Sequence, residues 1–262
     1  MTSFLALHRP GNPLLLPNPW DAGSARVLAA LGYQALATTS GGFAATLGRL
    51  DGSVTRDEAL AHAASVVAAT ELPVSADLEN GFADDPAGVA HTVSAAISTG
   101  LAGCSIEDAT GRADDPIYAA APAAERVAAA VEAAGERLVI TARAENHLHG
   151  RDDLADTIAR LQSFQEAGAH VLYAPGLTKP DEIRSVVTSV DRPVNVLALP
   201  GGPTVAELAE LGVARVSVGG AFALAALGAL VEAAQEFREH GTYRFWERAG
   251  VGRTIVREAF TR

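Results

Sequence analysis

The sequence predicts a single α/β domain, residues 1–262, that forms a (β/α)8 TIM barrel with extra C-terminal helices. Short β-branched, apolar runs alternate with longer Ala- and Leu-rich runs, and eight runs of the first kind occur along the 262 residues. Such alternation is typical of parallel βα units, and eight units fit a barrel of this length. Glycines recur at the ends of the helical runs. A doubly wound parallel sheet is the alternative fold.

The eight strand candidates are largely apolar and bounded by turn residues, as expected for strands that are buried on both faces. They are Leu14–Pro17, Ala35–Thr39, Val74–Leu78, Gly103–Glu107, Leu138–Ala142, His170–Ala174, Val194–Leu197 and Arg215–Val218. Amphipathic segments of helical length separate them, for example Arg56–Thr70 and Asp152–Ala167. We therefore expect a helix after each strand.

A glycine ends the predicted helix before every second strand. Gly32, Gly100, Gly168 and Gly212 hold this position, and the intervals from Gly32 to Gly100 and from Gly100 to Gly168 are each 68 residues. Glycine ends a helix there by adopting the left-handed conformation. Because glycine is common in such loops, the equal spacing adds only modest support for a repeat of paired βα units.

Two segments lie outside this pattern. Residues Glu107–Pro122 form a polar stretch, longer than the usual βα loop, which we interpret as a mobile active-site flap. Residues 241–262 form a helical tail that carries Tyr243, Phe245 and Trp246 in a chain with only 5% aromatic residues. We expect this tail to pack on a neighbouring subunit of a homo-oligomer.

Composition narrows the function classes. The chain has 20 Lys and Arg against 31 Asp and Glu, a net charge of −11, which argues against nucleic-acid and anionic-membrane partners. The first ten residues lack the features of a signal peptide. The single cysteine, Cys104, excludes an intrachain disulfide framework and is expected to be a buried thiol within a strand. We therefore expect a cytoplasmic protein that acts on a small molecule.

Acidic side chains cluster at the ends of neighbouring predicted strands, which in a barrel face the active site. Asp77 and Glu79 share one face of their strand, and Glu107 ends the next strand. Three carboxylates at one mouth repel each other unless a cation compensates, and oxygen ligands suit Mg²⁺, with Mn²⁺ as the alternative. Separately, each acid is also a typical helix cap. Their convergence favours a metal site.

Other strand ends supply candidate substrate-binding groups. Arg143 follows the apolar run Leu138–Ala142, and its guanidinium suits a substrate carboxylate, although a structural pairing with Glu107 or Glu145 is the alternative. Ser40, Gly41 and Gly42 form a loop whose hydroxyl and amides suit an anion. Asn195, on the seventh strand, completes the candidate set.

Several short motifs, taken in order, resemble the isocitrate lyase/phosphoenolpyruvate mutase superfamily. They are Pro19-Trp20-Asp21-Ala22-Gly23-Ser24-Ala25-Arg26, Thr39-Ser40-Gly41-Gly42, Leu47-Gly48-Arg49-Leu50-Asp51, Asp77-Leu78-Glu79-Asn80-Gly81-Phe82, Ile106-Glu107-Asp108 and Thr141-Ala142-Arg143-Ala144-Glu145. The resemblance runs from Pro17 to about Gly220. It implies a (β/α)8 barrel in which Mg²⁺ binds a 2-oxo or 2-hydroxy carboxylate, and a C–C or P–C bond next to that group is cleaved or formed.

The resemblance also implies roles for individual residues. Asp77, Glu79 and Glu107 match the metal shell, partly through waters, and Ser40 and Gly41 match the loop that binds substrate oxygens. Arg143 matches the arginine that holds substrate oxygens. Asp51 matches an aspartate close to the reacting centre, proposed as the nucleophile in the mutase branch. Family members commonly form tetramers in which the eighth helix packs on a neighbouring barrel, so we expect a dimer or tetramer with this helix exchanged.

The chain departs from the family pattern at two places. The flap of the lyase branch carries Lys-Lys-Cys-Gly-His and that of the mutase branch a lysine, but residues 109–121 contain neither Cys, Lys nor His. The usual Asp-x-Asp-Thr-Gly motif begins at Asp77 but has Glu79 as its second acid.

The expected function is a Mg²⁺-dependent lyase that cleaves a C–C bond through a metal-stabilised enolate, with Asp51 and Arg143 as catalytic residues and Tyr118 or Arg112 as flap candidates for proton transfer. Phosphonate P–C chemistry and an inactive metabolite-binding barrel are the alternatives.

Overall fold

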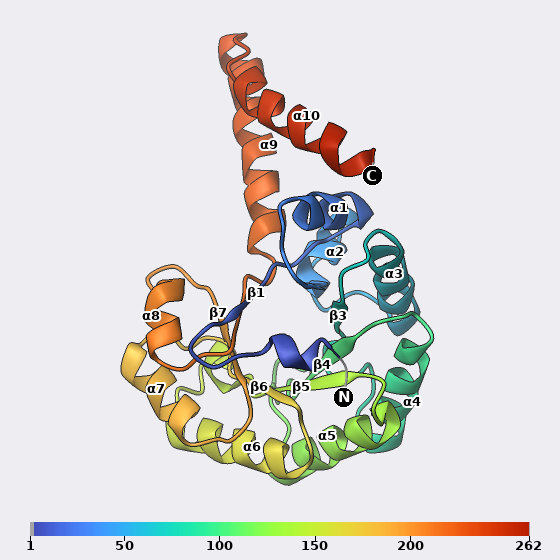
Figure 1. The fold of residues 1–262 in the computed structure, drawn as a ribbon, viewed down its shortest axis with the longest axis vertical. Coiled ribbons are helices and arrows are strands. Elements are labelled where there is room, and N and C mark those ends of the chain that lie inside the picture. Colours follow the sequence, from blue (N-terminus) through green and yellow to red (C-terminus); the bar gives the residue numbers. More distant parts are fainter. Residues whose placement is uncertain (1–2, 262) are drawn as a thin grey trace.

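The computed structural model describes residues 3–261, in which eight parallel strands are surrounded by helices (Figure 1). The strands pair in the order β1-β8-β7-β6-β5-β4-β3-β2. A backbone hydrogen bond from the Ala37 N–H to the Pro17 carbonyl links the two ends of this sheet. The sheet is a nearly closed (β/α)8 barrel, which confirms the predicted fold class over the doubly wound alternative.

The strands are β1 Leu14–Leu16, β2 Leu36–Ala37, β3 Val74–Asp77, β4 Gly103–Glu107, β5 Val139–Arg143, β6 Val171–Tyr173, β7 Val194–Leu197 and β8 Arg215–Ser217. The helices are α1 Ala22–Ala30, α2 Ser40–Thr46, α3 Arg56–Ala68, α4 Pro86–Ile97, α5 Ala120–Ala134, α6 Leu154–Glu166, α7 Pro180–Thr188, α8 Val205–Glu210, α9 Ala221–His240 and α10 Phe245–Phe260. Short 3-10 turns cover η1 Leu5–Leu7 and η2 Asn146–His149.

The observed bounds differ from the predicted ones by at most two residues at any strand end. The largest change is at β2, which ends at Ala37, two residues before the predicted end. The Thr38 hydroxyl accepts a hydrogen bond from the Asp77 N–H, and the Thr39 hydroxyl caps α2 by accepting one from the Gly42 N–H. As a result, the predicted loop at Ser40 is the first turn of a helix, and two helices follow β2 instead of one.

The four predicted helix-ending glycines are confirmed. Gly32, Gly100, Gly168 and Gly212 have φ angles of 90°, 83°, 96° and 84°, in the left-handed region that side chains with a Cβ avoid. Each follows the helix that leads into an even-numbered strand. Gly135, with a φ of 53°, ends α5 before β5 in the same way, so glycine at helix ends is not confined to alternate units.

The amino-terminal end of the barrel is closed by a small apolar cluster. Phe4 packs there with Leu14, Val139 and Val171. A Cβ at Gly103 would lie 2.6 Å from the Val139 carbonyl oxygen and 3.1 Å from Phe4 Cε1, so this position needs glycine. The interior is therefore sealed at one end, and a ligand enters from the opposite end, where the strands finish.

His8 lies directly above this seal and is held neutral. Its Nδ1 is 3.1 Å from the Phe4 carbonyl oxygen, and its Nε2 is 3.1 Å from Nη1 of Arg215, so Nε2 acts as an acceptor. Burial, with the Arg215 charge as second cause, lowers the pKa of His8 from its usual 6.5 to about 3.

The lowered pKa of His8 predicts a specific loss of stability in acid. Between pH 6.5 and 3 the unfolded chain binds a proton at His8 and the folded chain does not, so stability falls as the pH drops through this range. At pH 5 the loss is about 2 kcal/mol relative to pH 7.5. Urea unfolding of the wild type and of His8→Gln at both pH values measures it. An equal loss in both proteins would contradict the prediction.

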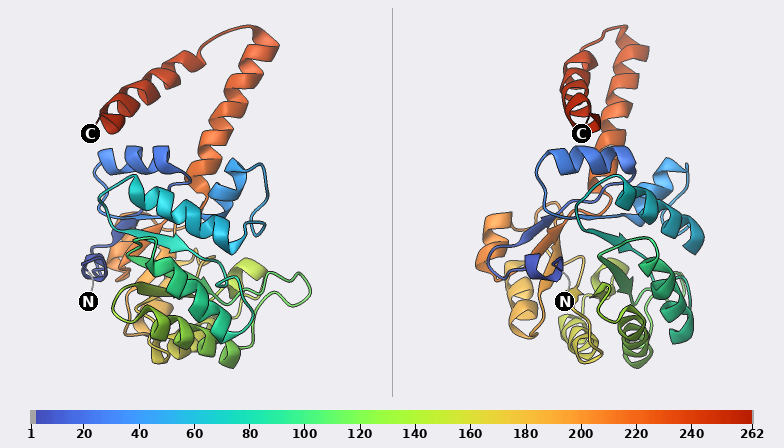
Figure 2. Two further views of the ribbon diagram at one scale, coloured as in Figure 1. Left: turned by 90° about the vertical axis from the view of Figure 1, so that its right-hand side faces the viewer. Right: turned by 45° about the vertical axis from the view of Figure 1, so that its right-hand side comes forward.

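The C-terminal helices leave the barrel, as Figures 1 and 2 show. α9 projects away from the strands, and α10 turns back so that its end meets α1, where Ala259 is buried. Large apolar side chains on α9 and α10 stay exposed, among them Leu224, Leu230 and Trp246. The outward-facing Leu15 on β1 is also 42% exposed, so this side of the barrel lacks a full helical cover.

Cys104 is fully buried in β4, and burial raises the pKa of its thiol to about 12, so it is an inert core residue. Among residues 3–261, no helix combines the length and apolar character needed to cross a bilayer.

Candidate active site

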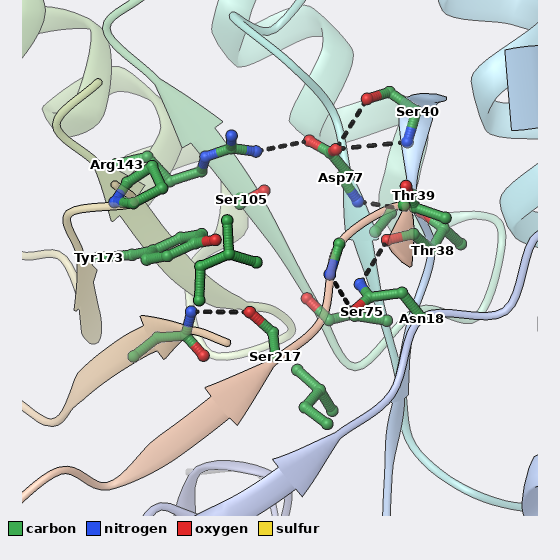
Figure 3. Close-up of a pocket in the computed structure, with 18 of the residues that line it drawn as sticks. Asn18, Thr38, Thr39, Ser40, Ser75, Asp77, Ser105, Arg143, Tyr173 and Ser217 are labelled. Carbon is green, nitrogen blue, oxygen red and sulfur yellow. Dashed lines mark hydrogen bonds and ion pairs between the residues drawn. The ribbon is translucent and has the colours of Figure 1, made fainter. Parts of the chain in front are cut away.

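A cavity of about 210 Å³ opens at the carboxyl ends of the strands (Figure 3). Of the residues predicted for the site, those that line it are Ser40, Asp51, Asp77, Arg143 and Asn195. Gly41, Gly42, Glu79 and Glu107 lie outside the lining. The cavity is deep as well as open, because its walls include side chains from the middle of the strands, such as Ser75 and Ser105.

Arg143 is the centre of the charged network. Its Nη1 lies 3.0 Å from Asp77 Oδ1, its Nη2 3.1 Å from Glu107 Oε2, and its Nε 2.7 Å from Glu145 Oε1. The guanidinium is also 5.3 Å from the centre of the Tyr173 ring. Burial alone would lower the pKa of Arg143, but the three carboxylates hold it well above its usual value. The guanidinium is therefore fixed, charged and aimed at the cavity.

Of the two alternatives for Arg143, the structure shows the pairing, with both Glu107 and Glu145, while substrate binding stays a prediction. The sequence did not indicate that one guanidinium joins all three acids, because the pairs cross from β5 to β3 and β4. Glu145 is 2% exposed and its N–H donates to Asp108 Oδ1 at 2.8 Å. Glu145 therefore holds the Arg143 side chain in place. This agrees with the sequence analysis, in which Glu145 was a structural partner for Arg143 and not a substrate-binding residue.

Asp77 is held from two sides, as Figure 3 shows. Its Oδ2 accepts hydrogen bonds from the Ser40 hydroxyl at 2.9 Å and the Ser40 N–H at 3.3 Å, while Arg143 approaches Oδ1. These contacts tie the first turn of α2 to the ends of β3 and β5. The Ser40 hydroxyl is thus oriented toward the cavity by Asp77 before any ligand binds.

Glu79 is strained and incompletely bonded. Its φ of 48° lies in the left-handed region, which costs a non-glycine residue about 1–2 kcal/mol. Within the described chain, its buried Oε1 has no hydrogen-bond partner. Burial, followed by the negative charges of Asp77 and Asp51, raises the pKa of Glu79 to about 7. A buried carboxylate oxygen that lacks a donor, next to two other acids, is suited to a cation.

Glu107 lies deeper than Glu79. Burial raises the pKa of Glu107 well above its usual value, Arg143 opposes this shift, and the negative charges of Glu145, Asp77 and Glu79 add to it. The Glu107 N–H donates to the Glu79 carbonyl at 3.0 Å, which fixes the spacing of the two backbones. Its positive counter-charge is the Arg143 guanidinium.

The predicted metal ligands, Asp77, Glu79 and Glu107, do not form a preformed coordination site. In residues 3–261, no group of three or more His, Cys, Asp or Glu side chains has the geometry to hold a metal ion. Arg143 lies between Asp77 and Glu107 and compensates their charge. The donors nevertheless fit Mg²⁺, which commonly keeps several waters and takes only one or two carboxylates. Asp77 and the unpartnered oxygen of Glu79 match that requirement.

The two adjacent glycines have different surroundings. A Cβ at Gly41 would lie 3.0 Å from Asp51 Oδ2, so Gly41 lets this carboxylate approach the start of α2. A Cβ at Gly42 would lie 2.5 Å from Thr39 Cγ2 and 3.3 Å from the Ala223 Cβ, and its N–H already bonds the Thr39 hydroxyl. Gly42, predicted to bind substrate, is placed in the packing between α2 and the start of α9 instead.

Alanine substitutions should separate these two glycines. Gly42→Ala is expected to destabilise the protein by about 1–3 kcal/mol because the capping threonine cannot move freely. Gly41→Ala is expected to leave stability within about 1 kcal/mol, since the exposed Asp51 side chain can shift, but to reduce activity by displacing that carboxylate. Thermal unfolding and activity of both variants test this. The opposite ranking in stability would contradict it.

Several residues that line the cavity were absent from the sequence-based candidate set. Tyr173, Ser217 and Arg215 line it together with Asn195. Asn195 donates to Ser217 Oγ at 3.0 Å and accepts from Arg215 Nε at 2.8 Å. Polar residues two apart on short buried strands were the available signal, because they share the inward face.

The predicted flap has a paired base and an exposed tip, and it does not line the cavity. Ala109 and Ile117 form an antiparallel bridge, and the Tyr118 hydroxyl and Arg112 both bond Asp84. No residue from 109 to 121 is among those that line the cavity in the described chain. The proton-transfer roles considered for Arg112 and Tyr118 would therefore require this loop to move.

The architecture matches a known family. The family model described as phosphoenolpyruvate phosphomutase matches residues 4–238. A candidate lyase/mutase of Burkholderia cenocepacia J2315 is 56% identical, with a TM-score of 0.92 over 97% of this chain and 93% of that chain. The 2-methylisocitrate lyase of Escherichia coli K12 is 31% identical over 209 residues, 72% of this chain and 70% of the lyase.

A phosphonopyruvate hydrolase solved as a complex with oxalate and Mg²⁺ has a TM-score of 0.83 at 23% identity, over 94% of this chain and 89% of that chain, which is a likeness of fold. The family model covers most of the chain, and the lyase relative exceeds 30% identity. The chain therefore belongs to the phosphoenolpyruvate phosphomutase family, in the isocitrate lyase/phosphoenolpyruvate mutase superfamily, and is an enzyme of the lyase or mutase type.

Proposed function

We propose that this enzyme is a Mg²⁺-dependent lyase that cleaves a C–C bond in a small 2-oxo or 2-hydroxy carboxylic acid. The observation that carries the proposal is the Arg143 guanidinium, which lines the cavity with Asp77 and is fixed by Asp77, Glu107 and Glu145. Glu79 lies outside the cavity lining, but its unpartnered Oε1 is buried and its pKa responds to the charge of Asp77. Such a site offers a positive group for a substrate carboxylate and oxygen ligands for a cation side by side. The 2-methylisocitrate lyase relationship supports the reaction class.

Asp77 and Glu79 would hold the metal, with Glu107 behind them, and Mn²⁺ is the alternative ion. When bound, Mg²⁺ supplies Lewis-acid stabilisation of the negative charge that develops on the substrate oxygen. Arg143 orients the substrate carboxylate, and its position is set in advance by Glu145. The Ser40 hydroxyl, which donates to Asp77 in the free enzyme, would exchange this hydrogen bond for one to a substrate oxygen. Asp51, exposed at the rim, accepts or returns the proton.

Phosphonate P–C bond cleavage or rearrangement is the second candidate. Asp51 favours it, because its carboxylate lines the cavity and would act there as the nucleophile toward phosphorus. The matched family model, described as phosphoenolpyruvate phosphomutase, supports the same chemistry.

A substrate panel separates the candidates. Purified enzyme with Mg²⁺ is incubated with oxaloacetate, alkylmalates, 2-methylisocitrate and phosphonopyruvate, and products are followed by NMR. A carboxylic product that depends on Mg²⁺ supports the lyase, whereas phosphate release that is lost in Asp51→Ala supports phosphonate chemistry. Tight oxalate binding without turnover of any compound would contradict both and favour a metabolite-binding barrel.

We also propose that the chain acts as a cytoplasmic homo-oligomer, in which α9 of one copy covers the exposed side of β1 on another. The exposed Leu224, Leu227 and Leu230 on α9 and the half-exposed Leu15 on β1 support this exchange. Light scattering after size exclusion is expected to give a dimer or tetramer. Leu227→Glu should shift it to lower mass, and a monomeric wild type would contradict the proposal.

A further inference from the structure

Arg215 lies at the floor of the candidate active-site cavity. It begins β8 and its side chain points into the barrel, where the residue is only 4% exposed yet still lines the cavity. Its three nitrogens contact neutral groups: Nε donates to Asn195 Oδ1 at 2.8 Å, Nη1 to His8 Nε2 at 3.1 Å, and Nη2 to Thr141 Oγ1 at 3.1 Å.

Within residues 3–261, no Asp or Glu forms an ion pair with Arg215, whereas Arg143 has three such partners. A guanidinium carries five N–H groups, so two remain available after the three neutral acceptors are satisfied. Burial, with the Arg143 charge as a lesser cause of the same sign, lowers the pKa of Arg215 to about 10, so the group remains charged at neutral pH. An unpaired buried charge is costly, which makes a ligand anion a natural counterpart.

The charge of the side chains that line the cavity therefore changes from its mouth to its floor. Asp51 and Asp77 make the mouth acidic, whereas the floor ends at an arginine without an acid. Thr141, which contacts Arg215, precedes Arg143 by two residues on β5, so the floor lies roughly 7 Å below the Arg143 level. The wall between carries hydroxyl groups from Ser105, Tyr173 and Ser217. A linear ligand with an anion at each end fits this arrangement.

We propose that Arg215 is a specificity-determining residue that binds a second, distal anionic group of the substrate, so that the enzyme selects dicarboxylates over monocarboxylates of equal length. The inference rests on the proposed function for the position of the first carboxylate, at Arg143 and Ser40. Arg215 contributes no proton or bond in this role. It acts by charge and by the two N–H groups that face no protein acceptor.

The test uses succinate and butyrate, which have the same chain length, differ in the distal carboxylate and lack a 2-oxygen, so that neither reacts. Calorimetry on the wild-type enzyme is expected to show succinate binding about 10- to 100-fold more tightly than butyrate. In Arg215→Met the ratio should fall to near one. Oxalate binding with Mg²⁺, which involves only the mouth, should stay unchanged in that variant.

Asn195→Asp is a second variant that guards against misfolding of Arg215→Met. Asn195 Oδ1 lies 2.8 Å from Arg215 Nε. An aspartate at position 195 would place a carboxylate there, and its negative charge would compensate the positive charge of Arg215. We expect a higher melting temperature together with loss of the succinate preference. A merely structural arginine would also give a more stable protein, but with the preference unchanged.

The outcomes distinguish this inference from the proposed function. A wild type without a preference for succinate, or a preference that survives in both variants, overturns the role of Arg215. If the preference is present and lost as expected but oxalate fails to bind with Mg²⁺, the Arg215 assignment stands and the proposed function fails. If oxalate binds with Mg²⁺ but succinate is not preferred over butyrate, the proposed function stands and the role of Arg215 fails.

Discussion

Arg143→Met is expected to destabilise the enzyme by about 3–5 kcal/mol at pH 8, the largest stability effect that the structure predicts. The substitution keeps most of the apolar stem but leaves Asp77, Glu107 and Glu145 facing one another without the guanidinium that joins them. Turnover should also fall by roughly 10²- to 10³-fold, because the substrate carboxylate loses its fixed partner. Denaturant unfolding and steady-state kinetics measure the two effects.

The stability loss in Arg143→Met should depend on pH in a defined direction. Burial already raises the pKa of Glu107, and removal of Arg143, the group that opposes this shift, raises it further. The folded variant therefore holds protons that the unfolded chain releases above its usual carboxyl pKa, so stability falls as the pH rises through the raised folded pKa. The deficit relative to wild type should be small near pH 5 and largest at pH 8.

Arg126→Met is the matched control for this experiment. Arg126 is also buried, at 1% exposure, but its guanidinium donates to backbone carbonyl groups of Asn80, Ala83 and Asp84 and not to carboxylates. Its replacement should destabilise the protein with little dependence on pH. A pH-independent deficit in Arg143→Met, or one no larger than 1 kcal/mol, would contradict the role assigned to Arg143.

Asp77→Asn is expected to weaken Mg²⁺ binding by roughly 10²-fold or more and to remove measurable turnover. The amide preserves the size of the side chain, and its one oxygen can still accept from either Ser40 or Arg143, so the fold should persist with a lower stability. The substitution removes the negative charge of one of the two carboxylates, Asp77 and Glu79, that would hold a hydrated cation. Titration with Mn²⁺ followed by electron paramagnetic resonance measures the free ion directly.

Asp57→Asn is the control for Asp77→Asn, since Asp57 is an exposed carboxylate in the first turn of α3 and does not line the cavity. It changes net charge by the same amount and should leave Mn²⁺ affinity as in the wild type. Equal affinity in wild type and Asp77→Asn would show that the cation binds elsewhere or not at all.

Much of this arrangement could be predicted from the sequence because the barrel imposes it. Strands buried on both faces appear as short apolar runs, and the carboxyl ends of parallel strands meet at one mouth. The chain positions of Asp77 and Arg143, at two such ends, were therefore sufficient to bring them into one cavity. Ser40 and Asn195 followed for the same reason.

The rest depends on three-dimensional relations that the sequence does not encode locally. Thr39 caps a helix at Ser40, and the helical rotation between neighbouring residues places Gly41 beside Asp51 but Gly42 in the core. The contact of Arg215 with Thr141 crosses the barrel interior over 74 residues of sequence, so only the closed barrel reveals its lack of an acidic partner. The bridge between Ala109 and Ile117 likewise depends on pairing within the loop that no sequence motif indicated, and the mobility expected of this loop stays a prediction.

The most direct test of the proposed site is calorimetric titration of oxalate, a planar analogue of an enolate, into the wild-type enzyme with Mg²⁺ and again with a chelator. If Asp77, Glu79 and Arg143 form a joint site for a cation and a carboxylate, oxalate binds tightly with Mg²⁺ and at least tenfold more weakly without it. Equal oxalate affinity with and without the metal would contradict a metal-dependent site at this mouth of the barrel.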